Sequence, residues 1–468
     1  MTSDRHPAPG SGPPPGCPAH AGHQPGAALY GPEFAADPGR TYDRLRAYGP
    51  AAPVELAPGV HAVLVTGYHA ALEVLGNPHI YSKDPRGWRA LQTGEVPPDS
   101  AVIPMMGYRP NALFSDPPAH GRFRHAITDS LRRVDPHALR RSVTHGADRL
   151  IDAFAARGHA DLLAEYAAIV PLLTFNRLFG QADAASDRLV TALAKMFEGG
   201  DGAAEGDALF TRYMVDLITL KRARPGADVT SWLMEHPARL TDEEMIHQCT
   251  LLIAAGTEPV QNLIGNALRL LLSDDRFAGS LSGGTMPVDA ALEEVLWKDP
   301  PMANYAVHYP RYDVWLRGVP LRAGDPVVIS LAAANTDPAL DTTLSRAGNR
   351  AHLAFSAGPH ACPAKAVARL IATVAIETLL DRVPDVALAV PADRLRWRPG
   401  PFQRALTALP ARFTPVSSST PGESTWTRPP APLPSTRPVA TYTEKQPAYA
   451  PPARRRRWSF PAAWLRGR

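Results

Sequence analysis

The sequence has few cysteines and no long apolar run. Its 468 residues contain three cysteines, Cys17, Cys249 and Cys362, which are far apart. This spacing excludes the disulfide framework of a small secreted domain and suits a reducing compartment. No apolar run reaches the roughly 20 residues of a transmembrane helix, and the first residues lack a charged-then-apolar signal pattern. We therefore expect a cytoplasmic protein.

A phosphate-binding loop and internal repeats are also absent. Residues 199–206 are rich in glycine, but no strand pattern precedes them and no Lys-Ser or Lys-Thr pair follows. We interpret this segment as a mobile loop between two helices that gates entry to a binding site.

The two ends differ in composition from the rest of the chain. Residues 1–27 are rich in Pro, Gly and His, and we expect a disordered arm. Cys17, His20 and His23 in this arm offer three zinc ligands without a fourth, so a zinc site is not favoured. Residues 416–468 are rich in Pro, Ser and Thr and lack helical periodicity, which is typical of a disordered tail.

The tail carries the positive charge of the chain. It has nine Lys or Arg and two Glu, a net charge of +7, whereas the whole chain has +4 and residues 1–415 therefore −3. The basic balance thus gives no evidence for nucleic acid binding, and no nucleic acid partner is expected. Arginines mix with Trp and Phe at 454–466, which suits contact with an anionic membrane surface or a signalling protein. A solvated tail is the alternative, and Pro461 interrupts any long amphipathic helix there.

Residues 28–415 show mostly helical spacing with a few short strands, which predicts a mainly α fold with small β regions. Helices are expected at 70–75, 137–156, 161–179 and 185–197, and strands with glycine turns at 53–66 and 314–331. The longest helix begins at Thr241, because Thr241-Asp-Glu-Glu244 is a capping box and an apolar run continues to Leu272. A helix of this length has to cross the middle of a large domain.

Cys362 lies in the most informative stretch, residues 355–364. A glycine-containing turn precedes this cysteine, and a helical pattern follows from Ala364 to Leu380. The unpaired N–H groups and the dipole at a helix N-terminus favour a thiolate. A thiolate is a good axial ligand for haem iron. The alternative is a buried structural cysteine.

This stretch resembles the haem-binding loop of the cytochrome P450 family, Phe-x-x-Gly-x-His-x-Cys-x-Gly. Phe355, Gly358, His360 and Cys362 match the pattern, and Ala364 replaces its last glycine. The resemblance extends over about Leu29 to Phe413 and implies one large domain at 28–415, with the long central helix over the haem. It also implies haem b as the cofactor, with iron bound by the cysteine.

Further matches concern the haem propionates. Residues 116–124 resemble the family's Asp-Pro-Pro-x-His-x-x-x-Arg, which implies that His120 and Arg124 hydrogen-bond a propionate. Taken alone, this pair would be an exposed helix face. His360 matches another propionate position. Where the family usually has an arginine for the second propionate, this chain has His308, which can donate the same hydrogen bond.

The resemblance implies a monooxygenase that oxidises a small organic substrate with O2. Ferredoxin and ferredoxin reductase are the expected partners, and they would supply the electrons. The redox partner would dock on the cysteine side, where basic residues attract an acidic protein: Arg122, Arg132, Arg133 and Lys365.

The central helix departs from the family's O2-activating motif, Ala-Gly-x-(Asp/Glu)-Thr. Here the motif reads Ala255, Gly256, Thr257, Glu258 and Pro259. Glu258 is a candidate proton-relay residue, whereas Pro259 has no hydroxyl and should loosen the helix. Thr257 faces another direction on a helix of 3.6 residues per turn. A water molecule could replace the hydroxyl if the site is polar and roomy.

A second departure replaces the family's Glu-x-x-Arg with Glu294-Val-Leu-Trp297. We expect Glu294 to pair with Lys298 at i+4, or with Arg346 or Arg350 from the following loop. The chain resembles an actinobacterial subgroup of the family that has Glu-x-x-Trp and is found near genes for small GTPase-like signalling complexes. The alternative function is therefore a ligand-binding or regulatory haem protein of a signalling complex, with its tail as the contact.

Overall fold

The computed structural model describes residues 26–182, 186–198, 201–274, 276–277, 287–340 and 349–416. All of them belong to one compact unit. The candidate zinc ligands, Arg346 and the basic and aromatic residues at 454–466 lie outside this part of the chain.

The fold is mainly helical. Its longer helices are α2 (Pro38–Arg46), α3 (Tyr68–Gly76), α6 (Ala119–Arg132), α7 (Pro136–Phe154), α8 (Ile169–Leu178), α9 (Ser186–Glu198), α10 (Asp201–Ala223), α12 (Asp242–Ser273), α14 (Pro287–Lys298) and α16 (Lys365–Arg382). Shorter helices are α1 (Pro32–Ala36), α4 (Arg89–Gln92), α5 (Ile103–Met106), α11 (Val229–Glu235) and α15 (Leu331–Asn335). Within the described residues, none of the helices is long and apolar enough to cross a membrane.

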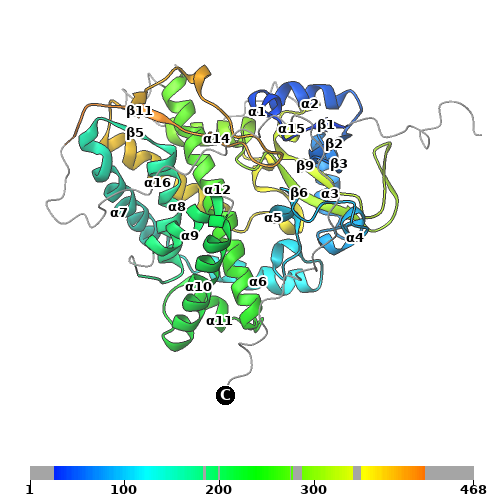
Figure 1. Cartoon of the computed structure of the whole chain (residues 1–468), viewed down its shortest axis with the longest axis horizontal. Coiled ribbons are helices and arrows are strands. Elements are labelled where there is room, and N and C mark those ends of the chain that lie inside the picture. Colours follow the sequence, from blue (N-terminus) through cyan, green and yellow to red (C-terminus); the bar gives the residue numbers. More distant parts are fainter. Residues whose placement is uncertain are drawn as a thin grey trace, which may run out of the picture. The chain divides into compact units, whose positions relative to one another are not determined.

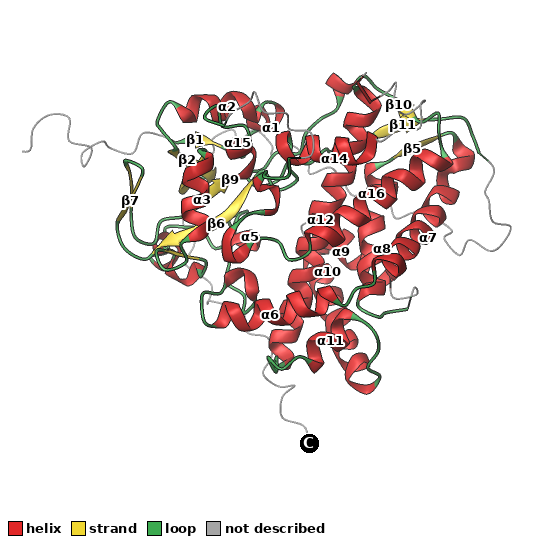
Figure 2. Ribbon diagram, turned by 180° about the vertical axis from the view of Figure 1, so that it is seen from behind, coloured by secondary structure: helices red, strands yellow, loops and turns green. Residues whose placement is uncertain are grey.

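The strands form three small sheets. A mixed sheet has the order β1 (Ala27–Ala28), β2 (Ala51–Ala57), β3 (Val60–Val65), β9 (Val327–Ser330), β6 (Asn304–Pro310) and β4 (Tyr81–Ser82). The others are β10 (Ala387–Leu388), β11 (Pro410–Arg412) and β5 (His159–Asp161), and the hairpin of β7 (Val314–Leu316) and β8 (Val319–Leu321). The mixed sheet lies on one side of α12, and α7, α8 and α16 lie on the other (Figures 1 and 2).

Local sequence signals place several of these elements correctly. Both expected strand regions form, and Gly59 has φ +74° at the β2–β3 turn, a conformation that favours glycine. The capping box of α12 is present: Glu244 N–H donates to the Thr241 hydroxyl at 3.2 Å, and Thr241 N–H donates to the Glu244 carboxylate at 2.9 Å. α12 continues through Pro259 without interruption. Pro259 offers no N–H to the Ala255 carbonyl.

Two expectations are wrong. Residues 161–179 are not one helix, because β5 ends at Asp161 and a π-helix (Leu163–Ala167) precedes α8. The Asp161 carboxylate accepts the N–H groups of Leu163 and Leu409, which ties this corner to the chain beside β11. The glycine-rich segment 199–206 is not a loop over most of its length, because α10 begins at Asp201. More than four glycine-free helical turns follow it in α10, and helix propagation overrides the local glycine signal.

Candidate functional site

The Cys362 loop has the expected place in the fold. Cys362 N–H donates to the Phe355 carbonyl at 2.8 Å, which closes the loop directly before α16, with Ala364 as the N-cap. Gly358 has φ +67°, and a side chain there would collide with the Leu75 carbonyl of α3. The glycine is thus required by the backbone conformation and by the close approach of α3. Cys362 itself is half-buried.

Two opposing effects act on the Cys362 thiol. Burial raises its pKa, and this is the largest effect. The Ala364 N–H and the charges of Arg124 and Lys365 lower it. The helix N-terminus therefore favours the thiolate as expected, but burial outweighs it in the protein alone. A bound metal cation would reverse this balance, because a coordinating thiol is deprotonated outright.

α6 brings His120 and Arg124 to the cysteine loop. The His120 and His360 rings stack with centroids 3.9 Å apart and planes inclined by 30°. The Arg124 guanidinium donates to the Ala361 carbonyl, next to Cys362. His120 is buried, so the pair is not an exposed helix face. The three residues expected to bind propionates from these two segments therefore lie together.

His308 and one unexpected residue complete a basic cluster, which we define as Lys83, His120, Arg124, His308 and His360. His308 is buried on β6, and its Nδ1 lies 2.6 Å from the Ala306 carbonyl. The Lys83 ammonium donates to the adjacent Val307 carbonyl at 2.7 Å. The charges of Lys83, His308, His120 and Arg124 all act on His360. Sequence reasoning missed Lys83, since no motif marks a lysine that follows a two-residue strand.

The basic cluster lacks a negatively charged partner among the described residues. Burial lowers the pKa of Lys83 to about 7 and that of His120 to about 4, and it lowers the pKa values of His308 and His360 as well. The Nε2 atoms of His120 and His360 are buried without a hydrogen-bond partner. In the part of the chain that the structure describes, no carboxylate forms an ion pair with any member of the cluster. Such a cluster fits an anionic ligand, and the two propionates of haem have this chemistry.

The middle of α12 presents an open face. Ala254 and Ala255 are exposed, although the residues on either side of this stretch include many that are buried. Gly256 packs against Phe175 of α8, which leaves no room for a side chain at position 256. Thr257 donates its hydroxyl to the Ile253 carbonyl at 2.8 Å, within its own helix. The open face is therefore lined by small apolar side chains.

Glu258 has a partner that sequence reasoning missed. Its carboxylate accepts a hydrogen bond from Arg398, which also donates to Gln403. Arg398 and Gln403 lie in the segment between Trp397 and Leu406, two residues that form a β-bridge. A pair separated by 140 residues leaves no local signal in the sequence. Glu258 is therefore not a free carboxylate on the open face of α12.

The Glu-x-x-Trp segment also differs from expectation. Glu294 pairs with Lys298 at 2.5 Å, as expected, and with Arg276 at 3.5 Å. Arg350, however, pairs with Glu293 at 3.3 Å and not with Glu294, and Arg369 contacts the same Glu293 carboxylate. The neighbouring Trp297 is buried and donates its Nε1–H to the Asn349 carbonyl at 2.9 Å. The Trp297 side chain thus fixes the backbone at Asn349 by a hydrogen bond.

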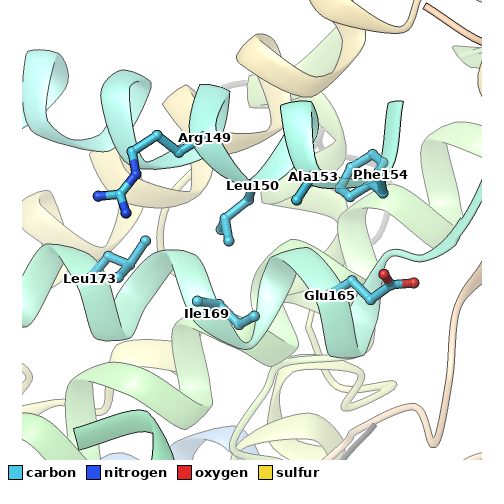
Figure 3. Close-up of a pocket in the computed structure, with 7 residues that line it drawn as sticks. All are labelled: Arg149, Leu150, Ala153, Phe154, Glu165, Ile169 and Leu173. Atoms are coloured by element: carbon cyan, nitrogen blue, oxygen red, sulfur yellow. The ribbon is translucent and has the colours of Figure 1, made fainter. Parts of the chain in front are cut away.

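Two hollows lie apart from the cysteine loop. One, between α7 and the segment of the π-helix and α8, has a volume of about 20 Å³ and is lined by Arg149, Leu150, Ala153, Phe154, Glu165, Ile169 and Leu173 (Figure 3). It has room for about one water molecule and carries no ligand site. The other measures about 230 Å³, and its lining includes Tyr42, Asp299, Arg398, Gln403 and Arg404. It reaches the residues that hold Glu258.

A cysteine directly before a helix and a basic cluster beside it have the chemistry of a haem-thiolate class of site. Comparison with known proteins agrees. Cytochrome P450 monooxygenase PikC of Streptomyces venezuelae is 36% identical over 400 residues, which cover 82% of this chain and 92% of the relative. The vitamin D(3) 25-hydroxylase of Pseudonocardia autotrophica is 30% identical, covering 83% and 97%. The chain belongs to the cytochrome P450 family.

Solved structures show the same fold. CYP154C4 from Streptomyces sp. has a TM-score of 0.73 at 30% identity, and the match covers 83% of this chain and 98% of that one. The myxobacterial CYP267B1 in complex with myristic acid has a TM-score of 0.72 at 26% identity, covering 82% and 98%. No family model matches the chain. The mainly helical fold with α12 as its long central helix is the cytochrome P450 fold.

Proposed function

We propose that the protein is a haem-thiolate monooxygenase that oxidises a small organic substrate with O2. The observation that carries this proposal is the gathering of the basic cluster beside the Cys362 loop, where Arg124 donates to the Ala361 carbonyl and His120 stacks on His360. The relatives named above are a monooxygenase and a hydroxylase, which supports the same reaction class. An axial thiolate favours O–O cleavage when haem is bound.

Each part of the site has a role in this proposal. Cys362 would hold the haem iron through its thiolate, and His120, Arg124, His308 and His360 would donate hydrogen bonds to the propionates of haem b. Phe355, Gly358 and Ala364 shape the loop that presents the thiolate. The exposed alanines of α12 leave space for an apolar substrate beside the haem.

Proton delivery is the unusual step. Glu258 is held by Arg398, and the Thr257 hydroxyl donates to its own helix. At position 259 there is no hydroxyl, but the Ala255 carbonyl has lost its helical N–H donor to proline and can accept a hydrogen bond from water. We infer that protons arrive on water held at this carbonyl, or through Glu258 after its carboxylate leaves Arg398. The 230 Å³ cavity would bring solvent to that ion pair.

A ferredoxin-type protein with its reductase is the proposed electron donor. The proposed docking surface on the cysteine side has less unpaired positive charge than the sequence alone suggests, because three of its four basic residues have carboxylate partners. Arg122 pairs with Glu244, Arg132 with Asp129 and Arg133 with Glu235. Lys365 is exposed and makes no ion pair within the described residues. The attraction for an acidic partner is therefore weaker than the count of basic residues suggests.

Reconstitution tests the proposal. The holoprotein should give a thiolate-type reduced carbon monoxide spectrum, and a spin-shift screen should identify a ligand that enters the haem pocket. With ferredoxin, reductase, NADPH and ¹⁸O2, that ligand should acquire labelled oxygen. Consumption of NADPH that is recovered entirely as hydrogen peroxide, for every ligand that shifts the spin state, would contradict a monooxygenase.

The second candidate is a haem protein that binds a ligand as a regulatory component of a signalling complex. Pro259 and the Glu258–Arg398 pair favour it, because they leave oxygen chemistry without its usual hydroxyl and with a bound acid. This protein would show tight ligand-induced spin shifts without turnover. Deletion of residues 416–468 should then abolish binding to the partner complex and leave the haem spectrum unchanged. Retained complex formation would remove the tail from this hypothesis.

A further inference from the structure

Lys83 is a buried cation whose charge no described carboxylate neutralises directly. The residue follows β4, and only 5% of its surface is exposed. Its ammonium donates one hydrogen bond, to the Val307 carbonyl, and two of its three N–H donors remain for another acceptor. A buried ammonium is costly unless it is paired, so its retention needs an explanation.

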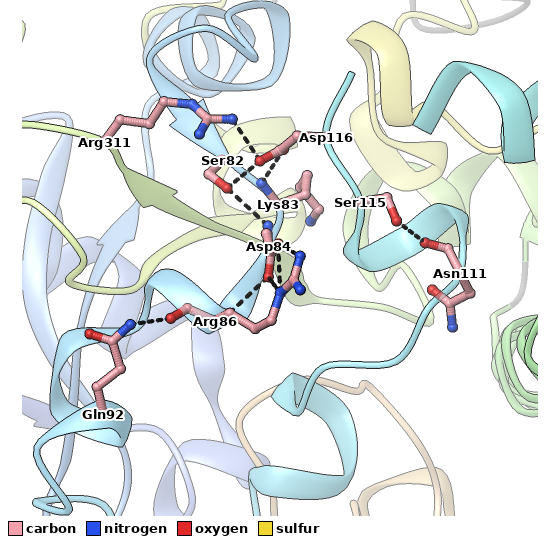
Figure 4. A network of polar contacts seen from close by, with 9 residues as sticks. All are labelled: Ser82, Lys83, Asp84, Arg86, Gln92, Asn111, Ser115, Asp116 and Arg311. Atoms are coloured by element: carbon pink, nitrogen blue, oxygen red, sulfur yellow. Dashed lines mark hydrogen bonds and ion pairs between the residues drawn. The ribbon is translucent and has the colours of Figure 1, made fainter. Parts of the chain in front are cut away.

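Asp116 is the nearest candidate partner, but its carboxylate is already occupied (Figure 4). One oxygen accepts the Ser82 hydroxyl at 2.5 Å and the Arg311 guanidinium at 2.6 Å, and the other accepts the backbone N–H of Lys83 at 2.8 Å. Arg311 therefore neutralises the carboxylate. Asp116 acts on the Lys83 ammonium through space only, and burial still lowers the Lys83 pKa to about 7.

The surroundings of Lys83 indicate which anion it meets. Its charge acts on the buried imidazoles of His308, His120 and His360, and His360 belongs to the cysteine loop. The Nε2 atoms of His120 and His360 are buried without a hydrogen-bond partner, so these imidazoles can offer hydrogen bonds to the same anion. Besides the imidazoles, the cluster contains two side chains whose charged forms can pair with a carboxylate, Arg124 on α6 and Lys83 beside β6. Haem has two carboxylates.

We propose that Lys83 binds one haem propionate and supplies the positive charge that balances it, while Arg124 binds the other propionate. His308 follows Val307, whose carbonyl Lys83 holds, and contributes a further hydrogen-bond donor beside it. The competing explanation is structural: Lys83 would only tie the Val307 carbonyl and thereby hold β6. The two explanations differ in whether the positive charge of Lys83 matters to haem itself.

The rate of haem loss from the holoprotein to excess apomyoglobin tests whether the positive charge of Lys83 contributes to haem binding. This inference rests on the haem binding contained in the proposed function. Lys83→Met and Lys83→Gln should lose haem about 10- to 100-fold faster than the wild type, as expected for a lost charge-assisted hydrogen bond. Lys83→Arg should stay within a few-fold of the wild type. Lys298→Met, which removes an exposed lysine, is the matched control, and a rate of Lys83→Met equal to this control overturns the inference.

Loading the full chain with protohaem dimethyl ester separates the two explanations. The ester has no propionate charge, so the difference between the wild type and Lys83→Gln should disappear if Lys83 acts on a propionate. A difference that persists with the ester shows a structural role and overturns the inference. Wild type that binds no haem would overturn the haem-thiolate proposal as well, whereas normal wild-type binding with an unchanged variant overturns only the role of Lys83.

Discussion

The two sides of the candidate site are built in opposite ways. On the cysteine side, basic side chains from α6, β6 and the loop converge without forming an ion pair with a carboxylate among the described residues. On the α12 side, Thr257 and Glu258 already have protein partners, and Pro259 has no donor at all. If the proposed function holds, this difference means that cofactor binding and proton delivery depend on separate segments. The second can change while the first is kept.

The largest expected effect comes from replacing Cys362 on the cysteine side. Cys362→Ser should abolish the thiolate-type carbon monoxide spectrum of the reduced protein, because a hydroxyl cannot replace the thiolate as axial ligand. Cys249→Ser is the matched control, since Cys249 is fully buried in α12 and burial raises its pKa to about 12. A thiolate-type spectrum in Cys362→Ser would show that another residue binds the iron.

On the α12 side, Pro259→Thr restores the hydroxyl of the family motif. We expect product formed per NADPH to rise by about 10-fold, less than the roughly 10²- to 10⁴-fold that a positioned proton donor contributes to a rate, because the yield per NADPH cannot exceed one. Pro259→Ala, which restores the helical N–H without a hydroxyl, should give little of this gain. Equal gains in both variants would assign the effect to the backbone hydrogen bond. Unchanged coupling in both would show that proton delivery does not limit the reaction.

The pH dependence of stability tests the burial of His120, on the cysteine side, in the haem-free chain. Burial lowers the pKa of His120 to about 4, against about 6.5 in an unfolded chain. Between these values the unfolded state binds a proton that the folded state does not, so stability falls as pH falls from about 6.5 towards 4. His120→Gln should reduce this loss by about 2 kcal/mol between pH 7 and 4.5, measured by urea unfolding of the haem-free chain. Parallel curves for both proteins would contradict the burial of a neutral His120.

The smallest effect concerns the Glu-x-x-Trp segment, which lies on neither side. Trp297→Phe removes the hydrogen bond to the Asn349 carbonyl and should lower the free energy of unfolding by about 1 kcal/mol. The carbon monoxide spectrum should not change. A lost haem spectrum in this variant would mean that the loop beyond Asn349 supports the cofactor side directly.

Local signals explain what the sequence predicts well. The capping box of α12, the Gly59 turn and the pattern around Cys362 each depend on residues close in the chain. The break at Asp161 depends on pairing with β11, and the Glu258–Arg398 pair joins residues 140 positions apart. Lys83 carries no motif, and its importance becomes visible only when its burial and its neighbours are known. The identities of the electron donor and the substrate stay predictions.

Gly256 and the alanine before it have opposite consequences for redesign. Any side chain at position 256 would enter the Phe175 ring of α8, so variants there should fold poorly whatever their chemistry. Ala255 is exposed, so larger side chains at that position would change the open face of α12 without disturbing the contact with α8. A library that aims to alter substrate choice should therefore vary Ala254 and Ala255 and leave their neighbour untouched.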